Sequence, residues 1–347
     1  SEKNFRRKGV YFFFAILCRN VLQNTFVNTF LEFEVVLPFY IPLGLGKTIT
    51  LGSDEGFYSY RFDEVIVNTS FKYPFEKPAE MLDVQKTKLI MMVAIRLSYK
   101  DFLKEAEFYY NYYFDKLIDN LNTIVISYMI ATKDDESHYL TKEMLPSHVV
   151  VSTTDLNTWE SNRGLFLLHE NVPYKKGLLT EEEIREIIRM QVVATYELNP
   201  FVTGEKYVLF AKRYMKQGFY QEAVLYAQVS VEVFIRQLFK ELLIEADNKL
   251  DEEVTQILED TSFMSIIKSK LPHYLGGNWN IKNETTAVGK WYKNTYLLRN
   301  RAIHVGKIPD FSESSEALHD AIEFRQFVLE RVVANKRKYP TLRNYFI

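Results

Sequence analysis

The chain has 347 residues, 47% of them hydrophobic, which is enough apolar material for two ordinary domains with packed cores. Its 43 basic residues nearly cancel its 45 acidic ones, so no overall positive field draws the molecule onto nucleic acid or an anionic membrane. The single cysteine, Cys18, excludes an internal disulfide framework and a cysteine-rich zinc site. This cysteine usage fits a reducing compartment, and we expect a cytoplasmic protein.

An apolar segment near the start of the sequence, Val10–Cys18, follows Arg6, Arg7 and Lys8 and so resembles the beginning of a secretory signal. Arg19 interrupts the run well short of the ~20 apolar residues that a membrane-spanning helix needs. The sequence therefore favours a buried first element and no membrane association.

The first 200 residues mix strand and helix signals. Side-chain character alternates in Leu31–Val35 and Phe57–Phe62, and strand-like runs return at His148–Ser152 and Gly164–His169. Between them, Asp101–Leu121 carries apolar residues at spacings of three and four, which predicts a helix. Residues 1–200 are therefore predicted to form an α+β domain, to which we assign a regulatory or sensor role.

No motif in this part predicts a cofactor or metal site. Gly44–Thr48 ends like a phosphate-binding loop, but the first glycine of that motif is replaced by Ile41, and a hairpin turn is favoured. The aromatic run Phe108–Phe114 could stack bases, yet its apolar stripe favours a buried helix. Asp134–Glu136 with His138 has no familiar ligand spacing and reads as a solvated loop.

Strand signals end near Asn199 and Gly204, and every strong signal after them is helical. We place a domain boundary there and predict a second domain over residues 204–347. Gly218 separates the first two expected helices, because glycine tolerates positive φ at a helix end. Four segments have the length of bundle helices: Glu205–Lys216, Tyr220–Ala246, Thr285–Val305 and Ser312–Lys336.

The segment Leu297–Gly306 ends the penultimate helix and carries the candidate chemistry. A stripe at spacings of four and three faces the bundle, and its members are Trp291, Thr295, Leu298, Ala302 and Val305. Asn300 and His304, four residues apart, then point outward, and Arg299 stands on the flank within reach of His304.

Arg299-Asn300, three further residues and His304 match the arginine, polar residue and histidine that mark ribonucleases of the HEPN family. The resemblance extends over about 140 residues, including the helical hairpin that begins at Gly218–Ala223 and the placing of the motif before a last long helix. On these features the C-terminal part resembles a HEPN domain. The family adds the expectation of an antiparallel helical bundle.

The resemblance implies a metal-independent endoribonuclease that cuts single-stranded RNA at a site shared by two copies of the chain, with no cofactor. In this chain Arg299 would hold the phosphate, Asn300 would orient His304 or a phosphate oxygen, and His304 would transfer a proton. Such domains are common in anti-phage and toxin–antitoxin systems. The N-terminal domain would then respond to an activating ligand or a phage protein.

Homodimer formation has its own signal in the Tyr220–Ala246 helix. Besides its main apolar stripe, the helix carries Leu225, Val229 and Phe239 on another side, which predicts packing on two sides. We expect symmetric pairing of two copies to bury this second side together with the outward Asn300–His304 stripe.

Three alternatives stay open. His304 could only cap its helix while Arg299 pairs with an acid, which would leave a non-catalytic HEPN-like scaffold that binds a nucleotide or a partner. The N-terminal domain could instead be the active part. Glu232, flanked by Gln228 and Arg236 at four-residue steps, could be a solvated charge or an acid that orients Arg299.

Overall fold

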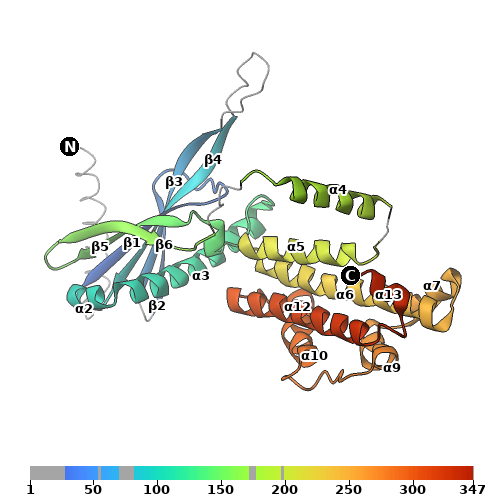
Figure 1. Cartoon of the computed structure of the whole chain (residues 1–347). Coiled ribbons are helices and arrows are strands. Elements are labelled where there is room, and N and C mark those ends of the chain that lie inside the picture. Colours follow the sequence, from blue (N-terminus) through green and yellow to red (C-terminus); the bar gives the residue numbers. More distant parts are fainter. Residues whose placement is uncertain (1–27, 54–55, 70–81, 172–176, 197–198, 347) are drawn as a thin grey trace, which may run out of the picture. The chain divides into compact units, whose positions relative to one another are not determined.

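The computed structural model describes residues 28–53, 56–69, 82–171, 177–196 and 199–346. The segment Val10–Cys18 lies outside these residues. The chain divides into two units, Ser1–Pro173 and Tyr174–Ile347, and each is described by itself. An antiparallel sheet with a long helix forms the first, and the second is helical (Figure 1). An α+β region followed by a helical region is therefore confirmed. None of the described helices is long and apolar enough to cross a membrane.

Six antiparallel strands make the sheet, in the order β2-β3-β4-β1-β5-β6. The strands are β1 (Thr29–Val36), β2 (Lys47–Ser53), β3 (Gly56–Thr69), β4 (Leu82–Ile95), β5 (His148–Asp155) and β6 (Ser161–Leu167). The central strand β1 pairs with β4 on one side and with β5 on the other, so Phe33 lies opposite both Met91 and Val151. All four strand predictions correspond to strands of this sheet, although β6 ends two residues before the predicted run Gly164–His169 does.

One face of the sheet is apolar because alternate residues of a strand point the same way. Leu31, Phe33 and Val35 of β1 are fully buried on this face, together with residues of β3, β4 and β5. On the opposite face, Glu34 forms ion pairs with Lys88 and Arg163. The alternation in Leu31–Val35 that predicted a strand is thus observed, although Glu32 on the opposite face is also buried.

The helix α3 (Ala106–Thr132) packs on the apolar face, after a short helix α2 (Tyr99–Lys104). Phe114, Leu117 and Leu121 of α3 are fully buried, and the hydroxyl of Tyr60 in β3 donates a hydrogen bond of 3.0 Å to the carbonyl of Leu117. The aromatic run in α3 is helical, as predicted, but only partly buried. Phe108 is 60% exposed.

The Gly44–Thr48 segment is a turn that leads into β2, whereas a phosphate-binding loop leads into a helix. Gly44 and Gly46 have positive φ angles of 87° and 72°. The amide of Gly46 donates to the carboxylate of Asp63 and to the carbonyl of Phe62, which fixes the turn beside β3.

The helical unit contains α4 (Glu181–Thr195), α5 (Val202–Lys216), α6 (Tyr220–Asp247), α7 (Asp251–Asp260), α8 (Phe263–Ser265), the π-helix η2 (Ile266–Lys270), α9 (Leu271–Leu275), α10 (Ala287–Lys290), the π-helix η3 (Trp291–Tyr296), α11 (Leu297–Val305), α12 (Phe311–Ala334) and α13 (Pro340–Asn344). Helices α5, α6 and α12 lie side by side (Figure 1). Gly218, with a φ of 80°, ends α5 as expected. The two predicted hairpin helices and the last long helix are therefore observed.

The longest helix, α6, runs through the core of this unit. Val231, Phe234 and Leu238 are fully buried, and α5, α7, α11, α12, α13 and the π-helices all pack against it. Phe239, on the second apolar side, is also buried. Leu225 and Val229, the other members of this side, are only half-buried, so packing on the second side is observed in part. Pairing of two copies through this side stays a prediction.

The division between the units, at Pro173 and Tyr174, precedes the position near Asn199 and Gly204 where the sequence signals change. Helix α4 lies between the two positions. Thr180 and Glu183 form the reciprocal hydrogen bonds of a capping box ahead of it. The domain boundary near residue 200 stays a prediction.

A buried amide joins α3 to the segment that follows it. The side chain of Asn122 donates to the carbonyl of Leu140 at 2.9 Å and accepts from its amide at 2.8 Å. Because Asn122→Ala leaves both backbone groups of Leu140 unpaired, we expect a loss of about 2–4 kcal/mol in the free energy of unfolding. Chemical denaturation measures it. Asn111→Ala, which removes only an exposed bond to Glu107, is the matched control and should cost under about 0.5 kcal/mol.

Candidate active site

The expected helix Thr285–Val305 is observed as three consecutive segments, α10, η3 and α11. The middle one, Trp291–Tyr296, has π-type hydrogen bonding. A π segment within an α-helix inserts extra residues into a turn and shifts the rotation of all that follows, and such segments are frequent at functional sites. The rotation of α11, which carries Arg299, Asn300 and His304, therefore depends on η3.

Trp291 fixes this rotation. Its indole is fully buried, lies 4.5 Å from the ring of Phe324 in α12 in a stacked arrangement, and meets Phe263 edge-on. One turn later, the hydroxyl of Thr295 donates to the carbonyl of Ala317 in α12. Aromatic contact on this scale and a satisfied buried hydroxyl hold η3 against α12.

A chain of hydrogen bonds joins η3 to α6. Trp291 Nε1 donates to Gln228 Oε1 at 3.0 Å, and Gln228 Nε2 donates to Glu232 Oε1 at the same distance. Gln228 is fully buried, so it belongs to the interior. This bond is the one observed for Glu232, which is half-buried, and the orienting role toward Arg299 stays a prediction.

The expected inward stripe is nearly complete. Trp291, Thr295, Leu298 and Ala302 are buried, but Val305, the last residue of α11, is 79% exposed. Gly306, with a φ of 73°, closes the helix by donating its amide to the carbonyl of Arg301.

The three predicted site residues lie on the outer side of α11. Arg299 and Asn300 are half-buried and His304 is exposed. Arg299 Nη1 donates to Asn300 Oδ1 at 3.1 Å, which turns the guanidinium toward the face that Asn300 shares with His304. Within the described part of the chain, Arg299 forms no ion pair and His304 no hydrogen bond.

This geometry bears on the alternative in which His304 only caps its helix and Arg299 only pairs with an acid. A histidine that capped α11 would donate to its last carbonyl groups, but Gly306 provides the cap through its own amide. The guanidinium of Arg299 bonds to an uncharged amide and keeps donors available for an anion. The arrangement can therefore bind a phosphate and exchange a proton beside it.

The second arginine of the segment, Arg301, is directed toward the start of α12. There Glu313 accepts from Lys307 and from the amide of Asp310. Burial acts to raise the pKa of Glu313, but these bonds and the charges of Lys307 and Arg301 outweigh it and lower the pKa below its ordinary value. Arg301 is thus partly balanced by an acid, in contrast to Arg299.

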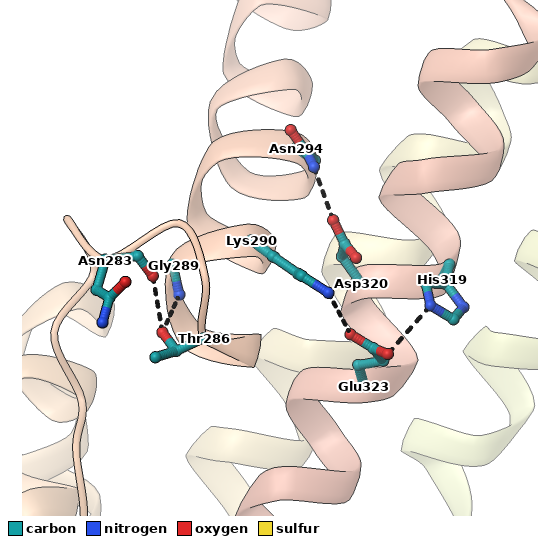
Figure 2. Close-up of polar contacts among 8 residues, drawn as sticks. All are labelled: Asn283, Thr286, Gly289, Lys290, Asn294, His319, Asp320 and Glu323. Carbon is teal, nitrogen blue, oxygen red and sulfur yellow. Dashed lines mark hydrogen bonds and ion pairs between the residues drawn. The ribbon is translucent and has the colours of Figure 1, made fainter.

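A second group of side chains, of types that can bind a metal ion, lies on α12. Candidate ligand atoms of His319, Asp320 and Glu323 are within 4.8 Å of one another, the one such trio among the described residues, and Figure 2 shows its neighbours on η3 and α10. Sequence reasoning found no partner for His319. The only available signal was the spacing of histidine and glutamate at four residues on one helix, which is common on surfaces.

Comparison with known proteins adds no further information, since no family model, curated protein or solved structure matches the chain.

Close packing between the start of α10 and the loop through Asn283 can be tested by substitution at Gly289. Thr286 caps α10 by accepting from the amide of Gly289 and donates its hydroxyl to the carbonyl of Asn283 (Figure 2). A Cβ at Gly289 would lie 2.0 Å from that same carbonyl oxygen. We expect Gly289→Ala to lower the free energy of unfolding by about 3 kcal/mol, because the backbone must move to relieve the overlap.

Thermal and chemical denaturation measure this loss. Gly164→Ala is the control, because nothing lies within 4 Å of its added methyl group. Equal stability of the two variants would show that the loop through Asn283 yields freely and does not hold α10.

Proposed function

We propose that the chain is a metal-independent endoribonuclease with a HEPN-like helical domain, cutting single-stranded RNA at Arg299, Asn300 and His304. The observation that carries the proposal is the pairing of an exposed histidine, free of hydrogen bonds among the described residues, with an arginine turned toward the same face by Asn300. Proton transfer and phosphate binding need these two groups within reach of one another.

The reaction needs little from the protein because RNA carries its own nucleophile. The 2′-oxygen bonds to the adjacent phosphorus, the bond from phosphorus to the 5′-oxygen breaks, and a cyclic phosphate and a 5′-hydroxyl result. One group must take the proton of the 2′-hydroxyl and another must give a proton to the 5′-oxygen. A histidine, whose ordinary pKa is about 6.5, suits either task near neutral pH.

Arg299 stabilises the phosphate as negative charge accumulates on its equatorial oxygens. A guanidinium makes charge-assisted and bidentate hydrogen bonds to phosphate. Asn300 accepts a hydrogen bond from the guanidinium and so holds it on the outer side of α11. The net charge of the chain is only −2, so RNA is attracted locally, by Arg299, Arg301 and the histidine.

The proposed site is shared by two chains because one His304 cannot easily act as both base and acid in the same turnover. Several side chains on and just after α11 are apolar and exposed, which suits a second copy packed here. We call this group the α11 apolar patch, and it comprises Leu297, Ile303, Val305, Ile308 and Phe311, which are 38–79% exposed. Two copies paired here bring two His304 side chains to one cleft.

The N-terminal α+β domain is assigned a controlling role, with an activating ligand or a phage protein as its partner. The resemblance to HEPN domains suggests an anti-phage or toxin-type effector that acts in the cytoplasm. We assign no catalytic group to the N-terminal domain, because a structural reading is favoured for each of its candidate motifs.

The first test is substitution at the site. Arg299→Ala and His304→Ala should each lower cleavage of single-stranded RNA by at least ~10²-fold, the usual scale for losing an acid–base or charge-stabilising group. Asn300→Ala should cost less, because the amide only orients a charge. Their melting temperatures should change little, since all three side chains lie outside the core. Arg185→Ala on α4 and His273→Ala on α9 remove the same residue types at exposed helix positions away from the motif and serve as controls.

The chemistry has a separate test on the substrate. A single 2′-deoxy nucleotide at the cut position should abolish cleavage, and added chelator should leave the rate unchanged. Cleavage of DNA or of the deoxy-substituted strand would exclude attack by the 2′-hydroxyl. Full activity of folded Arg299→Ala and His304→Ala proteins would leave the motif without a catalytic role.

The dimer is tested on the α11 apolar patch. Light scattering at micromolar concentration should give twice the monomer mass for the wild-type chain, and Val305→Asp should shift the mass toward the monomer and reduce cleavage with it. Val305 is 79% exposed, so its folding cost is small. Leu209→Asp, at a side chain 64% exposed on α5, is the matched control. A wild-type chain that is monomeric with and without RNA would rule out the shared site.

A further inference from the structure

The trio on α12 has the composition of a site for a transition metal ion. His319 offers an imidazole nitrogen, and Asp320 and Glu323 each offer a carboxylate oxygen. Imidazole with carboxylate suits divalent ions such as Zn²⁺, whereas Mg²⁺ prefers oxygen ligands alone. Because the three residues come from two neighbouring turns of a well-packed helix, their backbone positions are fixed before any ion binds.

The distances between these ligand atoms are close to those between two ligands of one bound ion. His319 Nε2 lies 3.1 Å from Glu323 Oε1. Ligand atoms about 2.0–2.2 Å from a tetrahedral ion are roughly 3.3–3.6 Å apart, so this pair needs almost no movement. The third atom, within 4.8 Å of the others, needs a shift of about 1–1.5 Å, which small side-chain rotations provide.

A buried carboxylate supplies an independent indication of a ligand. Asp320 is only 4% exposed, yet its one hydrogen bond comes from an uncharged group, Asn294 Nδ2, at 2.8 Å to Oδ2. Among the described residues, no cation pairs with it and no hydrogen bond reaches its other oxygen. A buried carboxylate ordinarily pairs with a cation or coordinates a metal. The second oxygen of Asp320 is not sealed from solvent, so a cation can reach it.

The neighbouring helix holds the carboxylates in the orientation that a metal site needs. Asn294 of η3 binds one oxygen of Asp320, and Lys290 of α10 approaches Glu323 Oε2 at 3.4 Å (Figure 2). In Asp320 this bond leaves Oδ1 for the ion, and in Glu323 it leaves Oε1, the oxygen that faces His319 Nε2. Outer groups that fix ligands in this way are a regular part of protein metal sites.

We propose that His319, Asp320 and Glu323 bind one Zn²⁺ ion per chain, with water completing the coordination. The ion neutralises the buried charge of Asp320, and through Asn294 it strengthens the contact of α12 with η3. It takes no part in the cleavage proposed above, which depends on α11. Lys290 lies beside Glu323 and its positive charge lowers the affinity for the ion.

The test is isothermal titration of the metal-free, tag-free full-length chain with ZnCl2, and with MgCl2 for comparison. We expect one Zn²⁺ per chain, much weaker binding of Mg²⁺, and a rise of about 5 °C in the melting temperature of the helical unit at saturating Zn²⁺. His319→Gln and Glu323→Gln should each weaken Zn²⁺ binding by at least about 10-fold. Both side chains are partly or largely exposed, so these variants fold.

Lys290→Gln keeps a hydrogen-bond donor beside Glu323 and removes the charge, so it should tighten Zn²⁺ binding by about 5-fold. His273→Gln and Glu330→Gln are the controls, since they alter exposed residues of the same types outside the trio. Absence of saturable Zn²⁺ binding, or unchanged affinity in His319→Gln, Glu323→Gln and Lys290→Gln, would overturn the proposal.

Discussion

The burial of Trp291 is the constraint on which the functional end of this molecule depends. The indole fills the space between α6 and α12, stacks on Phe324, and has its one donor satisfied by Gln228. Losing such a side chain from a core costs about 3–5 kcal/mol, so η3 cannot rotate to another position at low cost. With η3 fixed, Leu298 must face inward and the turn that carries Asn300 and His304 must face solvent.

Side-chain periodicity predicted most of the fold. It failed for elements that bury few of their own residues or whose geometry is set by packing against another element. β1 and α6 were predicted because one face or stripe of each is apolar. Helix α7 was missed because only Val254 among its ten residues is buried, so its sequence reads as a polar stretch. The π segment at Trp291 was also missed. Its extra residues are set by the packing of the indole on α12, which no spacing of apolar residues encodes.

The two candidate sites differ in how far the sequence could reveal them. Arg299, Asn300 and His304 lie within one short segment, so a motif and a helical wheel were enough to place them outward. The trio on α12 depends on groups from other parts of the chain. Asp320 is informative only because it is buried under Asn294, which precedes it by 26 residues, and this proximity exists only once η3 packs against α12.

The strand order has a consequence for synthesis of the chain. β1 is the first described strand to leave the ribosome, yet its two neighbours, β4 and β5, follow much later, and Thr29 pairs with Ile95 on one side and Asp155 on the other. At a translation rate of about 5–20 residues per second, β1 waits several seconds for its second partner. For most of that time α3 has not yet been completed, and until β5 follows the sheet is incomplete. The exposed Leu31, Phe33 and Val35 face makes this nascent segment a natural client for a ribosome-associated chaperone.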